Sequence, residues 1–413
     1  MSDSNVEKSN QNPLPEAMQR VRDKVLRAIA ELEPAGSPRS AAEPKGLFFS
    51  SRTNGGRDLP PYYLVYFLLV DLLQFPHMGR WEKSAWTVPV RYKGRLYGIE
   101  HRKMGLGIFA PNFDPGARTG TSPSEEAEAD ARAIALLVKK GVSAAEAYFE
   151  WRAEQVVNGG NLNVVNRSEP LFDRYMFFYA RFKALSAEYE LRKDERVIKK
   201  KTLQDGSELT TYAYPAQKVR AEARWNAQAA IEAFFSWTEH VFIHLGILQG
   251  TLRSGKDVAD LAAADWKTKF KAALDVQDAV THGHYEKMLD LRSQIRNFMA
   301  HGAFGKQGEA FSFHSGAGAV PVVLTQNSKQ RYSFTGQLAF DESAALMDIE
   351  VFLTHLWSGS RSPARLYIDS GLPSILTCVI DGTYTRAMRS DTEMQEFVDE
   401  LGSQFDRAGD MDW

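Results

Sequence analysis

The sequence is poor in the residues that form disulfides and thiolate metal sites, because its 413 residues include one cysteine, Cys378. A single cysteine excludes an intramolecular disulfide framework and any zinc site made of cysteines, and a reducing cytoplasm is the simplest location for such a chain. A strong net charge is also lacking, since 50 Lys and Arg stand against 52 Asp and Glu, a formal charge of -2. The whole chain therefore neither requires nor excludes a nucleic-acid partner, whose site would be a local basic patch.

Long apolar runs are absent as well. The longest, Tyr62 to Phe75, is too short to span a bilayer and contains Asp71. The N-terminus, MSDSNVEKSNQNPLPE, lacks the charged and then apolar pattern of a secretion signal. The sequence has no glycine-rich phosphate loop followed by lysine and no Gly-x-Ser-x-Gly elbow, which disfavours ATP-driven and serine-hydrolase functions. We therefore expect a cytoplasmic protein with no membrane partner.

Hydrophobic periodicity predicts a mainly α protein with an N-terminal α/β region and a small mixed C-terminal segment. Alternating apolar and polar residues after residue 83, interrupted by KGR and KMG turns, indicate an antiparallel β-meander. The expected regions are, in order, a disordered tail (1–13), an α/β region with the meander (14–115), a helical region (122–200), a helical domain (216–358) with a β-hairpin inserted at about 306–338, and a mixed segment (359–413).

The most periodic segment is VRAEARWNAQAAIEAFFSWTEHVFIHLGILQG, which we predict to be one long helix that stops at Gly250. Its apolar face is expected to consist of Trp225, Ala229, Ala233, Trp237, Val241, Leu245 and Leu248. The stretch KKKTLQDGSELTTYAYPAQK before it is expected to be a hairpin or an exposed loop around QDGS.

Local signals also predict where helices begin. Ser122 and Glu125 form a capping-box pattern with Pro123 at the first helical position, and Asp341 is placed to cap the helix in DESAALMDIEVFLTHLW. A side-chain oxygen at such a position accepts a hydrogen bond from an otherwise unsatisfied backbone N–H, so the two patterns predict helix starts near residues 123 and 342.

The stretch LDLRSQIRNFMAHGAFG carries the residues best suited to catalysis. Its apolar stripe predicts a helix that ends near Gly302 and holds Arg296, Asn297 and His301 in its last turns. A histidine moves protons near neutral pH, whereas an arginine binds a phosphate and offsets its developing charge, and Asn297 is placed to orient either group. These types suit phosphodiester cleavage, although a histidine is also favoured at a helix end by the helix dipole alone.

The sequence LRSQIRNFMAHG, expected on the third helix of a run of helices, resembles the motif of the HEPN family, in which an arginine is followed after four to six residues by a histidine at a helix end. A polar residue after the arginine, here Asn297, is common in that family, and QAAIEAFFSWTEHVFIHLGIL is similar to its earlier core helix. The resemblance covers roughly residues 219–357 and requires the β-hairpin to be an insertion before the last helix. The N-terminal 200 residues resemble nothing comparable.

The resemblance implies an all-α, HEPN-like helical bundle that dimerises, and a metal-independent endoribonuclease that acts as a toxin or in bacterial antiviral defence. Arg296 would then hold the scissile phosphate and His301 would assist proton transfer, with RNA as substrate, no cofactor and no metal, and an antitoxin or trigger protein as a further partner. An acidic residue of the earlier helix often supports such a site, and both Glu232 and Glu239 fit that part. The family also includes members that only bind RNA or protein, so a non-catalytic module is the alternative.

Other patterns are weaker. His240 and His244 have the spacing of a zinc-binding pair but no third ligand, and core packing explains them better. Glu100 and Lys103 resemble half of a metal-dependent nuclease core with the wrong spacing and no acidic partner. The aromatic residues of the meander fit a packed surface better than a ligand-recognition sheet. They are Trp81, Trp86, Tyr92 and Tyr97.

A basic run ends with Lys199, Lys200 and Lys201. It fits a solvated helix end better than an RNA-binding patch.

Overall fold

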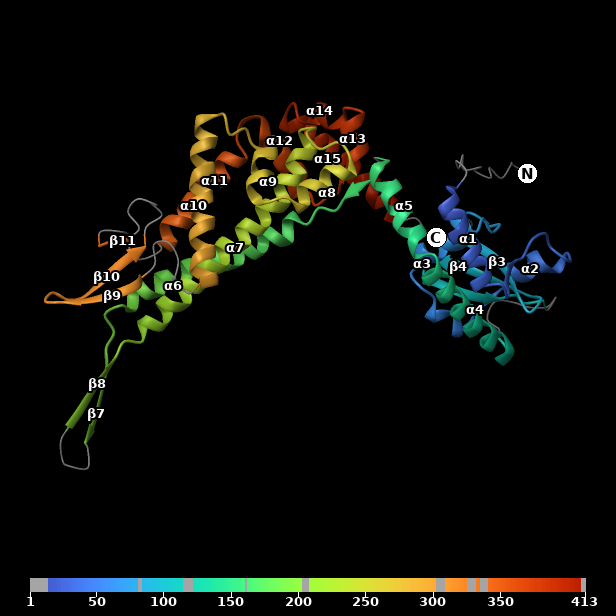
Figure 1. The fold of residues 1–413 in the computed structure, drawn as a ribbon, viewed down its shortest axis with the longest axis horizontal. Coiled ribbons are helices and arrows are strands. Elements are labelled where there is room, and N and C mark those ends of the chain that lie inside the picture. The colour runs from blue at the N-terminus through green and yellow to red at the C-terminus, as the bar shows by residue number, and fades with distance from the viewer. Residues whose placement is uncertain are drawn as a thin grey trace. The chain divides into compact units, whose positions relative to one another are not determined.

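The computed structural model describes residues 14–80, 84–113, 122–159, 162–202, 208–301, 309–324, 332–334 and 341–409, with the backbone but not the side chains of residues 296–301. The chain divides into two compact units, residues 1–156 with 406–413, and residues 157–405. The prediction of a mainly α protein with small antiparallel sheets is confirmed (Figure 1). Among the described residues, no helix has both the length and the apolar character needed to cross a membrane.

The first unit is built on a five-stranded antiparallel sheet in the order β1-β3-β4-β5-β2, which contains the predicted meander. Buried residues of the sheet pack against α1, α3 and α4 in one apolar core. The elements are α1 (Glu16–Ala28), β1 (Leu32–Pro34), α2 (Ala42–Phe48), β2 (Ser51–Arg52), η1 (Gly55–Asp58), α3 (Tyr62–Tyr66), η2 (Phe67–Leu72), β3 (Ser84–Tyr92), β4 (Arg95–Arg102), β5 (Gly105–Ala110), α4 (Glu125–Ala144) and α5 (Glu146–Asn158).

The second unit is organised around two long antiparallel helices, α6 (Ser168–Arg192) and α7 (Ala216–Leu248). Trp237 Nε1 donates to Ser168 Oγ at 2.9 Å near one end of the pair. The Arg220 guanidinium lies 5.5 Å from the centre of the Tyr189 ring near the other. The α7 helix is buried over much of its length because apolar residues occur on several of its faces. It stops as predicted, with Gly250 in the left-handed conformation at φ +77°.

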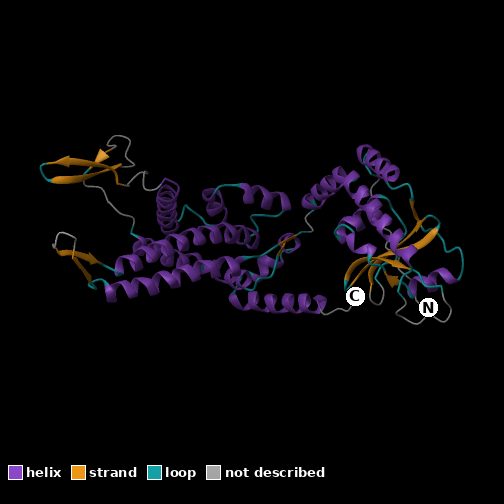
Figure 2. Ribbon diagram, turned by 90° about the horizontal axis from the view of Figure 1, so that it is seen from below, coloured by secondary structure: helices purple, strands orange, loops and turns teal. Residues whose placement is uncertain are grey.

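Short helices and small sheets complete the second unit (Figure 2). Of the two alternatives for residues 199–218, a hairpin or an exposed loop, the structure has the hairpin, and the hairpin predicted within 306–338 is present with a short third strand. The elements are β6 (Asn163–Val164), β7 (Val197–Thr202), β8 (Glu208–Ala213), α8 (Gly255–Ala263), α9 (Trp266–Ala273), α10 (Ala279–His301), β9 (Glu309–Ser315), β10 (Gly318–Leu324), β11 (Tyr332–Ser333), α11 (Glu342–Leu356), η3 (Gly359–Arg361), α12 (Ser362–Asp369), β12 (Ser374–Ile375), α13 (Leu376–Ile380), α14 (Thr383–Ala387) and α15 (Asp391–Gly409).

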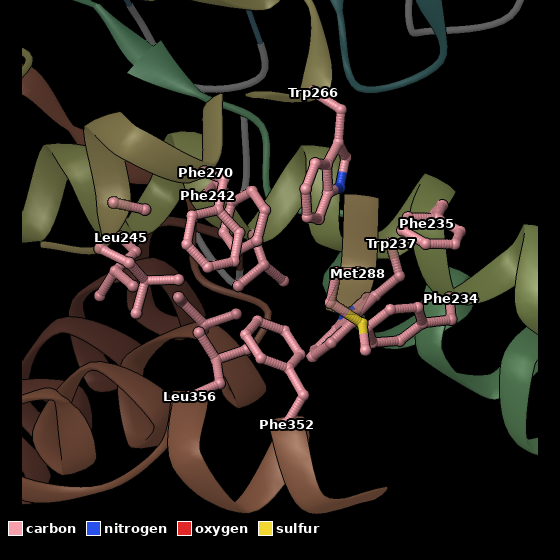
Figure 3. Packing of buried hydrophobic residues seen from close by; sticks show 14 of the residues in the cluster. Phe234, Phe235, Trp237, Phe242, Leu245, Trp266, Phe270, Met288, Phe352 and Leu356 are labelled. Carbon is pink, nitrogen blue, oxygen red and sulfur yellow. The ribbon is translucent and has the colours of Figure 1, made fainter. Parts of the chain in front are cut away.

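Apolar side chains from four helices form the centre of this unit, where Met288 of α10 packs with aromatic rings of α7, α9 and α11 (Figure 3). Phe270 of α9 stacks on Phe352 of α11, with ring centres 5.8 Å apart, and Trp266 Nε1 donates to Thr238 Oγ1 at 3.0 Å. Each buried aromatic ring removes a large apolar area from water, worth about 2–3 kcal/mol per side chain. The packing therefore fixes α7, α9, α10 and α11 relative to one another.

Two regional boundaries differ from the sequence-based expectation. Residues 122–200 do not form one region, because α4 and most of α5 belong to the first unit whereas α6 packs along α7 in the second. The mixed segment expected at 359–413 belongs in large part to the second unit, since Tyr367, Leu376 and Tyr384 are buried in the core of that unit. The division of the chain into units depends on which apolar faces pack together, and local periodicity does not determine this.

Two local predictions are wrong. The α4 helix begins at Glu125 and is capped by Ser124, whose side chain accepts from Ala127 N, so the Ser122 capping pattern is not used. Trp225 is 64% exposed although it lies on the predicted apolar face of α7. Trp225 is exposed because it lies near the start of α7, before the part of the helix in which most residues are buried.

Candidate active site

The predicted site residues Arg296, Asn297 and His301 lie in the last two turns of α10, and His301 is its final residue. Their side chains lie outside the described residues, so their placement rests on the backbone alone. Because the helix continues to His301, five residues separate it from Arg296 in regular geometry, which places the two about 140° apart around the helix axis. Helix geometry alone therefore does not bring the two side chains together in one chain.

Contacts with neighbouring helices establish the direction of α10. Its first half runs antiparallel to α11, because His284 stacks on His355 with ring centres 4.6 Å apart and Lys287 Nζ donates to Asp348 Oδ1 at 2.8 Å. Following α11 back to its start leads to Glu342, which accepts from Arg224 Nε near the start of α7 at 3.0 Å. The end of α10 is thus directed toward the end of the second unit where α6 ends and α7 begins.

One turn before Arg296, α10 is joined to α7 and α9 by a cluster of three charged side chains. Glu239 of α7 accepts from Arg292 Nη2 at 2.9 Å and from Lys269 Nζ at 2.8 Å. The Arg292 guanidinium also lies 5.6 Å from the centre of the Phe235 ring and 5.7 Å from that of Trp266. Cations over aromatic faces gain about 0.5–2 kcal/mol, so this contact adds to the ion pairs in holding α10 in place.

Glu239 is held in its anionic form. Burial raises the pKa of its carboxyl group, but the hydrogen bonds and charges of Lys269 and Arg292 outweigh burial and lower that pKa overall. A carboxylate with two cationic partners is a poor proton acceptor at neutral pH, so Glu239 suits a positioning role. Glu232 lies two turns earlier on α7 and is exposed. Of the two acidic candidates, only Glu239 contacts a described residue of α10.

Lys269 is the member of this cluster that sequence reasoning missed. Its side chain is 7% exposed, in contrast to most lysines. It follows Trp266 by three residues and precedes Phe270 by one, on the short helix α9. The only sequence signal is a lysine beside the apolar stripe of an amphipathic helix, and its acidic partner is thirty residues away in the chain. Such pairing across helices is invisible to local spacing.

The two histidines of α7 belong to one hydrogen-bonded chain, in which His244 is buried and His240 is half-buried. His240 Nε2 accepts from Arg167 N at 2.8 Å and lies 3.1 Å from His244 Nε2, while His244 Nδ1 lies 2.7 Å from Ser374 Oγ. Burial lowers the pKa of both rings, that of His244 to about 3, so both are neutral at physiological pH. Among the described residues, no group of three or more His, Cys, Asp or Glu is placed to hold a metal ion.

The weaker candidates of the first unit that the structure describes lie on β3 and β4 and in the turn that follows β4. Glu100 is fully buried on β4 and accepts from Arg102 Nε at 2.7 Å, and burial raises the pKa of its carboxyl group. Lys103 lies in the turn after β4. The meander aromatics Trp86, Tyr92 and Tyr97 are buried, as a packed surface requires, and Trp81 lies outside the described residues.

No family model, curated protein or solved structure matches this chain.

Proposed function

We propose that the second unit is a metal-independent endoribonuclease of the HEPN type, with Arg296, Asn297 and His301 as its catalytic residues, acting in bacterial antiviral defence or as a toxin. The observation that carries the proposal is the position of this trio in the last turns of α10, a helix anchored to α7 through Arg292 and Glu239. The family resemblance of the motif supplies the reaction type, and a cytoplasmic location follows from that role.

In the proposed reaction, the ribose 2′-OH attacks the adjacent phosphorus. The 2′-O–P bond forms, the P–O5′ bond breaks, and the products are a 2′,3′-cyclic phosphate and a 5′-hydroxyl end. Arg296 binds the phosphate and stabilises the charge that develops on its oxygens. His301 transfers protons between the 2′-OH and the leaving 5′-oxygen. Asn297 orients the phosphate or the imidazole. The need for a 2′-OH restricts the reaction to RNA.

A site shared by two subunits is consistent with the geometry of α10. The Cα positions of Arg296 and His301 are about 140° apart around the axis of a continuous helix. In a homodimer with two-fold symmetry, the end of α10 meets its own copy, and Arg296 of one chain lies opposite His301 of the other. We therefore place the site at a homodimer interface.

The test is cleavage of total RNA in EDTA by wild-type protein and by the Arg296→Ala and His301→Ala variants. We expect cyclic phosphate ends with the wild type and a loss of at least about 100-fold in rate for each variant, with unchanged circular dichroism. Unchanged cleavage in either variant contradicts the proposal. A wild-type protein that dimerises or binds RNA without cleaving it supports the non-catalytic alternative instead.

A further inference from the structure

The strands β7 and β8 form a two-stranded ribbon at the tip of the α6–α7 pair (Figures 1 and 2). Every described side chain of the ribbon is exposed except that of Thr210, which is half-buried. The register runs from Val197 opposite Ala213 to Thr202 opposite Glu208. An isolated two-stranded ribbon has no core of its own and is marginally stable in water, so a partner that binds its exposed side chains would stabilise it.

The two faces of the ribbon differ in charge among the described residues. Side chains alternate between the faces of a strand, so Lys199 and Lys201 lie on one face and Lys200 on the other. Lys200 lies 3.8 Å from Glu208, whereas Lys199 and Lys201 have no ion pair among the described residues. Packing the face of Lys199 and Lys201 against an apolar protein surface would remove two ammonium groups from water without partners. The phosphates of a nucleic acid supply partners to these two lysines.

The ribbon and the candidate site lie at the same end of the second unit. The ribbon connects the end of α6 to the start of α7, and α10 is directed toward that end, as the Arg224–Glu342 ion pair and the antiparallel course of α11 show. Figures 1 and 2 both show β7 and β8 at the end of the unit from which β9 and β10, which follow α10, also project. A nucleic acid held by the ribbon therefore lies on the side of the unit that holds Arg296 and His301.

We propose that the β7–β8 ribbon binds the base-paired stem of the RNA substrate through its phosphates and so presents an adjoining unpaired segment to the site at the end of α10. This inference rests on the proposed function and specifies its substrate as a structured RNA. Exposed aromatic rings stack on unpaired bases, but the described strands carry one, Tyr212, which favours phosphate contact with a stem over a base-stacking platform.

Binding is measured with a fluorescent RNA stem-loop and protein carrying His301→Ala, which prevents cleavage. Adding Lys199→Gln and Lys201→Gln is expected to raise Kd about tenfold and to lower the slope of log K against log salt concentration by about 1.5, since two phosphate contacts are lost. The matched control is Lys256→Gln with Lys267→Gln, two exposed lysines of α8 and α9. Its Kd is expected to match that of the His301→Ala parent.

Equal binding by the ribbon variant and the control overturns the proposal. So does a loss confined to unpaired RNA, or one confined to duplex DNA of the same sequence. In the cleavage assay, the ribbon substitutions in otherwise wild-type protein are expected to raise KM for the stem-loop about tenfold and to leave kcat and cleavage of a dinucleotide unchanged. If His301→Ala keeps full cleavage, the proposed function fails whatever the binding result; if it abolishes cleavage but the ribbon variant binds normally, only the ribbon assignment fails.

Discussion

Arg292 Nη2 donates to Glu239 Oε1 at 2.9 Å and so joins α10 to α7 one turn before Arg296. Lys269 shares the same carboxylate, which makes Glu239 the common partner of two cations from two helices. The position of the candidate active site thus depends on one acidic residue that is not itself suited to catalysis. Substitutions can therefore test the proposed positioning role of Glu239 separately from the proposed catalytic roles of Arg296 and His301.

Glu239→Gln is expected to lower both stability and cleavage. The amide leaves the almost buried Lys269 ammonium without an anionic partner, which costs about 1–3 kcal/mol of unfolding free energy in a partly exposed cluster. Because Arg296 follows Arg292 by one turn, a displaced α10 is expected to lower kcat about tenfold. Urea unfolding followed by circular dichroism measures the first effect, and RNA cleavage measures the second.

Glu232→Gln is the matched control for this change. Glu232 lies two turns before Glu239 on the same helix and is exposed, so its substitution is expected to change the unfolding free energy by less than about 0.5 kcal/mol. A larger cost for Glu232→Gln than for Glu239→Gln would contradict the assignment of the positioning role.

Local signals succeeded where the physical cause is local. Asp341 was predicted as a cap and accepts from Ala344 N at 2.9 Å, and the meander was predicted from alternation and turn residues. The stretch that begins at Lys199 was expected to be a hairpin or an exposed loop, and the pairing of β7 with β8 is that of a hairpin. Ser122 failed because Ser124, two residues later, offers the same capping group, and the sequence pattern does not choose between them. The basic run was expected at a helix end, but Lys199 to Lys201 lie in β7, beyond the end of α6.

Contacts between distant segments were beyond sequence reasoning. Nothing in the spacing of Lys269, Glu239 and Arg292 connects the three, since their meeting depends on how α7, α9 and α10 pack. For the candidate site itself, sequence predicted a helix that ends near Gly302; α10 is described as far as His301, and Gly302 lies outside the described residues. The catalytic role of Arg296 and His301 stays a prediction, because it concerns side chains outside the described residues and a second subunit.

Acid is expected to destabilise the second unit through His244. Burial lowers the pKa of this ring from 6.5 to about 3, so below pH 6.5 the unfolded chain binds a proton that the folded chain does not. Stability contributed by the neutral ring is therefore complete above pH 6.5 and is lost as the pH falls toward 3. One such proton lowers the unfolding free energy by about 2 kcal/mol between pH 6.5 and 5. Urea unfolding at a series of pH values measures this slope.

His244→Gln is expected to reduce that slope by about one proton, even if it lowers stability at neutral pH by disturbing the contact with Ser374. The control is His282→Gln, which replaces an exposed histidine of α10. If His282→Gln flattens the pH dependence of stability as much as His244→Gln does, the buried His244 ring is not the source of that pH dependence.

Removing the β7–β8 ribbon is expected to leave the fold intact. Replacing residues 197–213 with a short Gly-Ser turn deletes no described residue that is buried, so the unfolding free energy should change by less than about 1 kcal/mol. Thermal unfolding and the helical circular dichroism signal measure this. A loss of several kcal/mol would show that the ribbon packs against the unit and would remove the argument that its lysines face solvent.

Mixing two inactive variants tests whether the site is shared between chains. If Arg296 of one subunit acts with His301 of the other, a heterodimer of Arg296→Ala and His301→Ala contains one site with both residues intact and one with neither. Random exchange makes about half of the dimers heterodimers, and half of their sites are intact, so the mixture should recover about a quarter of wild-type cleavage. RNA cleavage after refolding the two proteins together measures this, with each variant refolded alone as the control. If the site is instead confined to one chain, no cleavage is recovered, because neither variant chain holds both side chains. Absence of recovery would therefore require His301 to turn back toward Arg296 of its own chain at the end of α10.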